Sequence, residues 1–314
     1  MIRFHDITAA AERIAGRVHR TPLLSARTLG EPYGTRLFLK AESLQKTGSF
    51  KVRGALNRVD TLDDAARARG LIAVSAGNHA QAVAYAARAS RTRCTVVMPD
   101  TAPKTKIAAT EAYGGTVVLH GTVGDAFRKM EELRAEHGYT LVHPFEDPVL
   151  MAGQGTVGLE ILEDLPDVDV LIVPVGGGGL ISGVATAVRH LRPSARIIGV
   201  EPVGAAAVTV GLNAGRVQPL ERVDTIADGL GAPMTGDLVL EHVRALVDDI
   251  VTVTDEAIAH AMSAILARAR LLVEPAGAAG YAAIASGAVD VAGRTTAVIL
   301  SGANVDLDRL KSLI

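Results

Sequence analysis

The sequence has a single cysteine, no marked excess of charge of either sign, and no long apolar run. Cys94 cannot form an internal disulfide, and the apolar segment around it, Cys94–Met98, indicates a core residue rather than a nucleophile. The net charge is −2 and the basic residues are scattered, unlike the basic patch of a nucleic-acid-binding protein. No apolar stretch is long enough to cross a bilayer, and the N-terminus lacks the apolar centre of a signal peptide. We therefore expect a cytoplasmic protein that binds neither nucleic acid nor membrane.

The rest of the composition is that of a folded globular chain. Of 314 residues, 48% are hydrophobic and 21% are charged, far from the polar, highly charged profile of disorder. The length suits about two domains of ordinary size, and we find no internal repeat, low-complexity tract or long linker. We therefore expect two domains in close contact, with a ligand site in the cleft between them.

From residue 71 onward, short apolar strands alternate with helices. Residues 71–74 and 95–98 have the pattern of strands, and the alanine-rich segment 78–89 between them has that of a helix. Such alternation is typical of βαβ units around a parallel sheet. The strand at 168–175 is apolar almost throughout, which indicates that helices cover both faces of its sheet. The pattern predicts an α/β fold with largely parallel sheets.

Further helices are predicted where apolar residues recur at helical spacing. These segments are residues 8–18, 154–163 and 255–272. Asp6 or Thr8 is the expected N-cap of the first helix.

Four consecutive glycines, Gly176–Gly179, follow the strand and precede a helix predicted to begin at Leu180. Glycine allows close approach of the backbone to a ligand, and a helix N-terminus offers free N–H groups to an anion. The alternative is a flexible turn, but four glycines at this junction favour a phosphate cradle. The loop lacks the Lys and Ser/Thr of a P-loop and the spacing of a dinucleotide fingerprint. It therefore predicts a small phosphorylated cofactor rather than ATP.

A second loop, Ser75–His79, also lies between a strand and a helix. Its backbone N–H groups could bind a carboxylate for the same reason. A simpler interpretation is that Asn78 is the helix N-cap. A histidine in the first helical turn, such as His79, is more often structural than catalytic.

A third loop contains Lys51, followed by the helix-compatible run Val52–Val59. A lysine at a helix start opposes the helix dipole, so a purely structural role explains it poorly. Desolvation and the dipole would both lower its pKa, and Schiff-base chemistry requires a neutral amine. Taken alone, however, the loop favours an exposed lysine, because most lysines are exposed.

Together the three loops resemble fold-type II enzymes that use pyridoxal 5′-phosphate (PLP), in the branch of threonine/serine dehydratases and serine racemases. The resemblance covers nearly the whole chain and keeps the order of the family's motifs. These are Ser49-Phe-Lys51, Ser75-Ala-Gly-Asn-His79, Ala152-Gly-Gln-Gly-Thr156, Gly176–Gly179, Gly199-Val-Glu-Pro202, Ile226-Ala-Asp-Gly229, Val273-Glu-Pro-Ala-Gly277 and Ser301-Gly-Ala-Asn304. The chain is most similar to the short, catabolic type of threonine dehydratase, because it ends soon after the last motif and carries no regulatory domain.

The resemblance implies a role for each matching residue. Lys51 would hold PLP as a Schiff base and act as the catalytic base, and Phe50 would pack against the cofactor ring. Asn78 would bind the phenolic oxygen of PLP, and Ser301 would face its pyridine nitrogen. The phosphate would be bound by Gly176, Gly177, Gly178 and Gly179. The substrate carboxylate would be bound by the loop of Ser75, Ala76, Gly77, Asn78 and His79.

The resemblance also implies an architecture similar to the β subunit of tryptophan synthase. Two three-layer α/β domains would enclose the active site in the cleft between them. Residues 1–67 and 146–314 would form the large PLP-binding domain, and residues 68–145 the small domain that carries the substrate loop. The family implies a homodimer.

The predicted reaction is loss of water and then ammonia from L-threonine or L-serine, giving 2-oxobutanoate or pyruvate. Racemases of this branch carry a second serine that works on the opposite face of Cα, and this chain has Ala76 at that position. A methyl group cannot carry a proton, so we expect elimination to exceed racemisation. The segment Gly121–Asp125 lacks the arginine expected for a second substrate carboxylate, which weighs against 3-hydroxyaspartate.

A divalent cation is not expected. Family members with a cation site carry a glutamate matching Glu201 and an acidic residue a few positions later, and no carboxylate follows here. Ca²⁺ and Mg²⁺ require several oxygen ligands. The alternatives that stay open are a serine racemase, a dehydratase of another β-hydroxy amino acid, and, more distantly, a non-catalytic amino-acid-binding protein.

Overall fold

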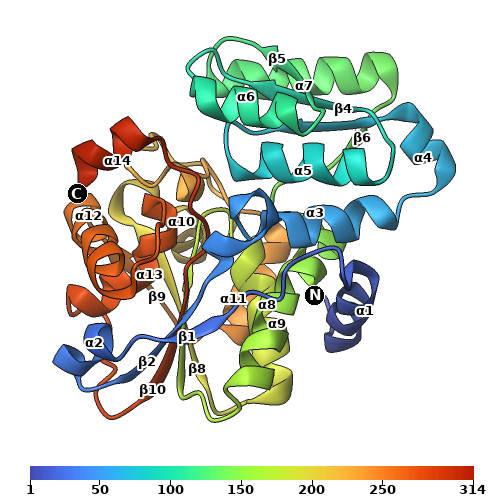
Figure 1. Cartoon of the computed structure of the whole chain (residues 1–314). Helices are drawn as coiled ribbons and strands as arrows, with labels where there is room; N and C mark the ends of the chain where they lie inside the picture. Colours follow the sequence, from blue (N-terminus) through green and yellow to red (C-terminus); the bar gives the residue numbers. More distant parts are fainter.

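The computed structural model describes residues 1–314 and contains two sheets with helices packed around them (Figure 1). The larger sheet has six strands in the order β1-β2-β10-β7-β8-β9. Only the β1–β2 pair is antiparallel. Its strands are β1 (Leu23–Ser25), β2 (Arg36–Lys40), β7 (Val170–Pro174), β8 (Arg196–Pro202), β9 (Asp249–Val253) and β10 (Thr295–Ile299).

Helices cover both faces of this larger sheet. One face carries α1 (Phe4–Ile14), α8 (Pro148–Asp164), α9 (Gly179–Leu191) and α11 (Asp237–Leu246), which contribute to one apolar core. The other face carries α12 (Asp255–Ala264) and α13 (Pro275–Ala285), which contribute to a second core. The central strands β7 and β10 are buried along their whole length, as expected when both faces are covered.

The smaller sheet has four parallel strands in the order β5-β4-β3-β6. They are β3 (Leu71–Val74), β4 (Cys94–Met98), β5 (Thr116–Leu119) and β6 (Thr140–Leu141). Three helices connect them: α5 (Asn78–Ala89), α6 (Lys104–Ala112) and α7 (Val123–His137). This layer lies above the larger one in Figure 1. The predicted α/β class with largely parallel sheets is confirmed, whereas the domain boundaries at 67/68 and 145/146 stay a prediction.

The remaining helices connect these layers or flank the ends of the chain. They are α2 (Arg27–Gly30), α3 (Lys51–Asp60), α4 (Asp64–Arg69), α10 (Ala207–Ala214) and α14 (Leu307–Leu313). No helix is both long and apolar enough to traverse a lipid bilayer.

Glycines bring α3 and α9 unusually close to α8, which lies between them. A Cβ on Gly153 of α8 would lie 2.6 Å from the Cα of Gly54 in α3. On the α9 side, a Cβ on Gly183 would lie 2.2 Å from the carbonyl oxygen of Met151. Because α3 begins with Lys51 and α9 begins at the tetraglycine loop, α8 sets the spacing between these two segments.

Buried charges also hold α3 in place. Arg53 is fully buried and pairs with Glu42 and with Glu160 of α8, at 2.8 and 2.6 Å. Lys40 of β2 completes the group with a bond of 2.5 Å to Glu160. Each buried charge has an opposite partner, which avoids the large cost of an unpaired ion in the interior. Arg53 is two residues from Lys51, so this network fixes the start of α3.

Three helix predictions were wrong at their ends. The first helix covers Phe4–Ile14 instead of 8–18, and Asp6 lies inside it, accepting a bond from the backbone N–H of Arg3. The second begins at Pro148, and Gly153, the one glycine before residue 154, packs against α3 without breaking the helix. The third ends at Ala264 and continues as a π-helical turn to Ala269.

Candidate active site

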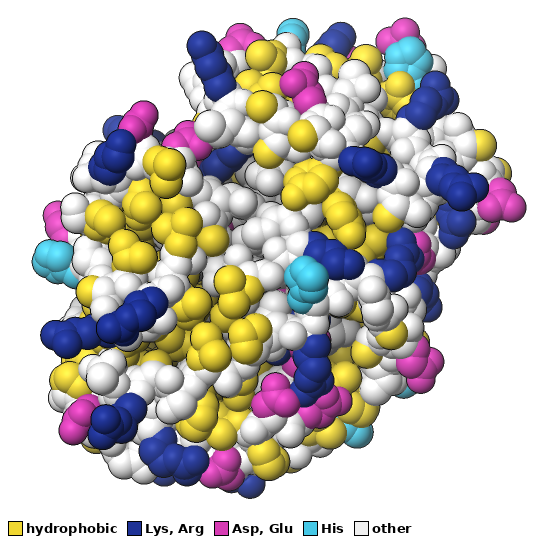
Figure 2. Space-filling view, viewed as in Figure 1, with side chains coloured by type: hydrophobic (Ala, Val, Ile, Leu, Met, Phe, Trp, Pro, Cys, Tyr) yellow, Lys and Arg dark blue, Asp and Glu magenta, His cyan; other side chains and the backbone are white.

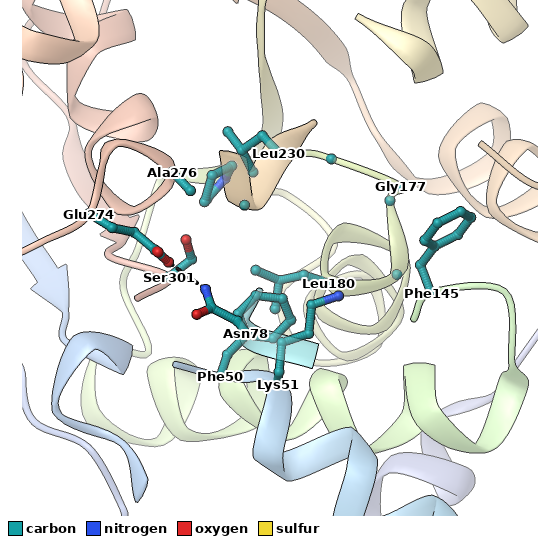
Figure 3. A pocket seen from close by; sticks show the side chains of 15 residues that line it. Phe50, Lys51, Asn78, Phe145, Gly177, Leu180, Leu230, Glu274, Ala276 and Ser301 are labelled. Carbon is teal, nitrogen blue, oxygen red and sulfur yellow. Dashed lines mark hydrogen bonds between the residues drawn. The ribbon is translucent and has the colours of Figure 1, made fainter. Parts of the chain in front are cut away.

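A pocket lies beyond the carboxyl ends of β7 and β10, where ligand sites of parallel α/β sheets are found (Figure 3). Segments far apart in the chain meet there. They are the start of α3, the start of α5, the turn before α9, the start of α13 and Ser301, two residues after β10. The lining residues are Phe50, Lys51, Asn78, Phe145, Pro174, Gly176, Gly177, Gly178, Gly179, Leu180, Gly229, Leu230, Glu274, Ala276 and Ser301.

The tetraglycine loop offers a row of free backbone donors to this pocket. Gly178 is the N-cap of α9, with φ +93°, and no side chain caps the helix. None of the backbone N–H groups from Gly176 to Ile181 donates to an acceptor within the protein. Side chains are excluded here, because a Cβ on Gly177 would lie 2.1 Å from Cδ1 of Phe145. Free N–H groups at a helix N-terminus form the kind of site that binds phosphate.

Lys51 is the first residue of α3 and points into the same pocket (Figure 3). Its Nζ donates a hydrogen bond of 2.7 Å to the carbonyl oxygen of Pro144 and lies 5.3 Å from the centre of the Phe50 ring. No carboxylate pairs with it, and desolvation lowers the pKa of Lys51 to about 8. The amine is therefore neutral in a useful fraction near neutral pH, as a Schiff-base lysine requires.

Asn78 does not cap α5, contrary to the simpler interpretation of its loop. The N-cap is Gly77, which forms no side-chain cap bond. The Asn78 amide is turned toward the pocket wall, where its Nδ2 donates to Oε1 of Glu274 and its Oδ1 accepts from Nδ2 of Asn304 at 2.8 Å. A second N–H of the Asn78 amide is left for a ligand.

Ser301 and Phe50 lie on adjoining parts of the wall. The backbone N–H of Phe50 donates to the carbonyl oxygen of Ser301 at 3.1 Å, and Ser49 pairs with Gly302 in a short β-bridge. The lysine loop and the end of β10 are therefore tied together. Ser301 brings a neutral hydroxyl to the pocket, and its pairing with a pyridine nitrogen stays a prediction.

Of the five residues predicted to bind the substrate carboxylate, only Asn78 lines the pocket. The backbone N–H of Gly77 donates to Oγ of Ser75 at 3.1 Å, and Ala76 packs against the apolar core of the smaller sheet. His79 is buried, with Nε2 2.8 Å from the carbonyl oxygen of Val142. Desolvation lowers the pKa of His79 to about 3. These contacts favour the structural interpretation of His79, and carboxylate binding by the loop stays a prediction.

Glu201 has a definite structural partner. Its carboxylate accepts bonds from the backbone N–H groups of Val208 and Thr209 at 2.8 and 2.9 Å, and from Oγ1 of Thr209 at 2.6 Å. It therefore caps the start of α10, and desolvation raises its pKa. The expectation that no divalent cation binds here stays a prediction.

The sequence-based site omitted several lining residues, of which Glu274 and Phe145 are the most notable. Glu274 is buried, and desolvation raises its pKa to about 7. It belongs to the motif Val273–Gly277, which was visible in the sequence but carried no assigned role. Gly229 belongs to another such motif. Nothing in the sequence singled out Phe145. It lines the pocket next to Pro144, whose carbonyl oxygen accepts the hydrogen bond from Lys51.

The residues present fit PLP. The cofactor's phosphate matches the free N–H donors of the tetraglycine loop, and its aldehyde matches the desolvated amine of Lys51. Both groups line one pocket, as a small phosphorylated aldehyde would require.

Comparisons with known proteins agree with this chemistry. The family model described as "Pyridoxal-phosphate dependent enzyme" matches residues 14–302. The catabolic L-threonine dehydratase TdcB of Escherichia coli (strain K12) is 42% identical over 99% of this chain and 96% of its own length. The crystal structure of a threonine deaminase from the organism abbreviated T.th. is 44% identical, with a TM-score of 0.92 over 98% of this chain and 99% of that one.

A racemase is also similar. The structure of maize serine racemase has a TM-score of 0.94 and 40% identity, over 99% of this chain and 96% of that one. The predicted resemblance is therefore confirmed, for the cofactor and for the dehydratase and racemase branch. The chain belongs to the family of pyridoxal-phosphate dependent enzymes.

Proposed function

We propose that this chain is a PLP-dependent ammonia-lyase that converts L-threonine or L-serine to 2-oxobutanoate or pyruvate and ammonia. The observation that carries the proposal is one pocket lined by both a desolvated lysine amine and a free tetraglycine N–H cradle. Full-length similarity to threonine dehydratases supports this choice of substrate.

When bound, PLP supplies the electron sink that stabilises negative charge at the substrate Cα. The free N–H groups from Gly176 to Ile181 would hold its phosphate. The amine of Lys51 would hold the cofactor and would be the base that accepts the Cα proton at Nζ. Its pKa of about 8 leaves enough neutral amine for that role near neutral pH.

Ser301 favours elimination because its hydroxyl is neutral. If Ser301 faces the pyridine nitrogen of PLP, its hydroxyl would not stabilise a protonated ring as an aspartate would, and this would favour loss of the β-hydroxyl over a long-lived charge at Cα. The walls formed by Phe145 and Leu230 are apolar and restrict water around the reacting atoms.

The decisive measurement is the visible spectrum of the purified protein with PLP, followed by addition of L-threonine and L-serine. We expect a bound-cofactor band that is absent in Lys51→Ala, and release of 2-oxo acid from the wild-type protein only. A panel including 3-hydroxyaspartate separates the other β-hydroxy amino acids. A protein that stays colourless with PLP would support a non-catalytic binding protein instead.

Racemisation is the second candidate, favoured by the similarity to serine racemases. Ala76 argues against it, because its methyl group cannot deliver a proton to the opposite face of Cα. We predict that Ala76→Ser raises the ratio of racemisation to elimination, by roughly 10-fold or more if it supplies a proton donor. Chiral analysis of recovered serine beside 2-oxo acid release measures that ratio. An unchanged ratio would remove this objection to a racemase, and Ala76→Gly serves as the control for altered loop packing.

We also propose that the protein is a homodimer, as the family resemblance implies. Hydrophobic side chains gather on the left side of the face seen in Figure 2, over the larger sheet, which supports a covered surface there. Light scattering gives the mass in solution. The cytoplasmic location stays a prediction from sequence.

A further inference from the structure

We propose that Glu274 and Asn304 are positioning residues that hold the Asn78 amide in the one orientation that presents an N–H to the cofactor. This inference rests on the proposed cofactor site and assigns a function to two residues that the proposed reaction does not use. Both act through Asn78.

The first support is a chain of hydrogen bonds with a fixed direction. Nδ2 of Asn304 donates to the backbone carbonyl of Thr47 and to Oδ1 of Asn78, each at 2.8 Å. The carbonyl can only accept, so it forces the NH₂ group of Asn304 to that side. Oδ1 of Asn78 must then face Asn304, and Nδ2 of Asn78 must face the carboxylate of Glu274, to which it donates.

The second support is that the residues at both ends of this series of hydrogen bonds, Thr47 and Glu274, are held rigidly. Thr47 has φ +67° although it is β-branched, and the adjacent Gly48 has φ +68°. A Cβ on Gly48 would lie 2.5 Å from Oδ1 of Asn304. At the other end, the backbone N–H of Glu274 donates to the carbonyl of Gly302 at 3.0 Å, and a Cβ on Gly302 would lie 2.3 Å from Oε1 of Glu274. A β-branched residue in the left-handed region persists only where its surroundings hold it there.

The third support is the cost of burying Glu274. Its side chain lies in the pocket wall, and Figure 3 shows it pointing toward Asn78 and Ser301. No cation pairs with it directly. Lys106 favours its charged form, while Asp228 opposes it. A buried carboxyl without an ion partner is poorly explained by stability alone, whereas a charged acceptor for the Asn78 amide gives it a use.

The consequence concerns the second N–H of Asn78. With one N–H bound to Glu274 and Oδ1 bound to Asn304, the amide cannot flip, so the remaining N–H keeps its direction into the pocket. These hydrogen bonds also join the start of α5 to the lysine loop and to the start of α13. They therefore tie the smaller sheet to the larger one at the proposed cofactor site.

The test is a double-mutant cycle on PLP affinity, measured at pH 8, where a group of pKa about 7 is mostly ionised. Apo-protein of the wild type, Glu274→Ala, Asn78→Ala and the double variant is titrated with PLP and followed by visible absorption. We expect Glu274→Ala to weaken PLP binding by roughly 10-fold, the scale of a lost charged hydrogen bond. In the Asn78→Ala background the same change should cost less than about 2-fold, and Glu274→Gln should restore most of the affinity, because it keeps an acceptor oxygen.

Asn304→Ala tests the same idea if Glu274→Ala does not fold. It removes the donor to Asn78 without leaving a buried charge, and its loss of PLP affinity should also vanish in the Asn78→Ala background. Tyr281→Phe is the matched control. Tyr281 lies in α13, the helix that Glu274 precedes, and its hydroxyl donates a buried hydrogen bond to the carbonyl of Leu29, but it does not line the pocket. The substitution should lower the thermal midpoint of the apo-protein and leave PLP affinity within about 2-fold.

Independent effects would overturn the inference. If Glu274→Ala and Asn304→Ala weaken PLP equally with and without Asn78, both residues act on stability or on the cofactor by another route. The readout is cofactor affinity, so a protein that binds PLP but does not deaminate threonine would refute the proposed reaction and leave this test intact.

Discussion

At the scale of single residues, the site depends on an amine that is desolvated but has no carboxylate partner. Lys51 donates a hydrogen bond to a backbone carbonyl, which stabilises the charge of an ammonium group less than a carboxylate would. Burial is the cause of its lowered pKa. A lysine in water has a pKa near 10.4 and is almost wholly charged at neutral pH. Here the environment, rather than the residue type, brings the pKa of the amine toward neutral pH.

This gives a pH prediction for cofactor capture. The neutral fraction of Lys51 increases as pH rises through about 8, so the rate at which apo-protein captures PLP should increase over pH 7–9 and then level off. Stopped-flow absorbance at the bound-cofactor band measures the rate. Lys51→Ala should show no capture at any pH. A midpoint near 10.5 would mean that the amine is solvated before PLP arrives.

At the scale of elements, α8 decides where the two halves of the cofactor site lie. It packs against α3, which begins with Lys51, and against α9, which begins at the tetraglycine loop. Gly153, Gly155 and Gly183 allow backbones to meet at distances that any side chain would prevent. Glycine weakens a helix by about 1 kcal/mol relative to alanine. The close packing that these glycines allow offsets this loss of helix stability, and it sets the distance between the Lys51 amine and the tetraglycine loop.

We predict that Gly183→Ala destabilises the apo-protein by about 2–3 kcal/mol and weakens PLP binding, because its Cβ would lie 2.2 Å from a backbone oxygen of α8. Gly124→Ala is the matched control. Gly124 also lies in a helix, α7, but a Cβ there would meet nothing closer than 3.8 Å, so the change should stabilise by about 0.5–1 kcal/mol. Since the chain has no tryptophan, circular dichroism is the suitable measure of unfolding. Similar losses for both variants would contradict a role for close packing at Gly183.

At the scale of the whole molecule, two histidines around the end of β6 make the stability of the fold depend on pH. His79 donates to the carbonyl of Val142, and Nδ1 of His143 accepts from the backbone N–H of Glu146. Desolvation lowers the pKa of His79 to about 3 and that of His143 to about 4. Both rings are therefore neutral when folded and become protonated on unfolding below about pH 6.5.

The sign of the resulting pH dependence follows from proton binding. Below pH 6.5 the unfolded chain binds protons that the folded chain does not, so stability is lost as pH falls from 6.5 toward 4. Glutamine stays neutral and can still donate to the carbonyl of Val142. We therefore predict that His79→Gln reduces the change of unfolding free energy with pH by about 1.4 kcal/mol per pH unit. Thermal unfolding of apo-protein from pH 4 to pH 8 measures it. Equal slopes for both proteins would show that the ring is protonated in the folded state.

The fold was largely predictable because its strands are short and apolar and alternate with helices. The helix at Asn78–Ala89 and the strand at Leu71–Val74 have the predicted limits. Other limits were wrong. Helix α8 begins six residues before the predicted residue 154, and α12 ends in a π-helical turn. Strand β9 was not predicted, because its edge position leaves it only partly buried and less apolar.

The sequence by itself indicated the two groups of the proposed cofactor site, but by different routes. Four glycines before a helix form a local pattern, whereas Lys51 was indicated only by the resemblance of the three loops together to a known family. Only the tertiary structure decided the orientation of Asn78, whose partners Glu274 and Asn304 lie 196 and 226 residues away. Hydrogen bonds between such distant groups leave no periodic pattern, and they form only after both sheets have brought the segments together.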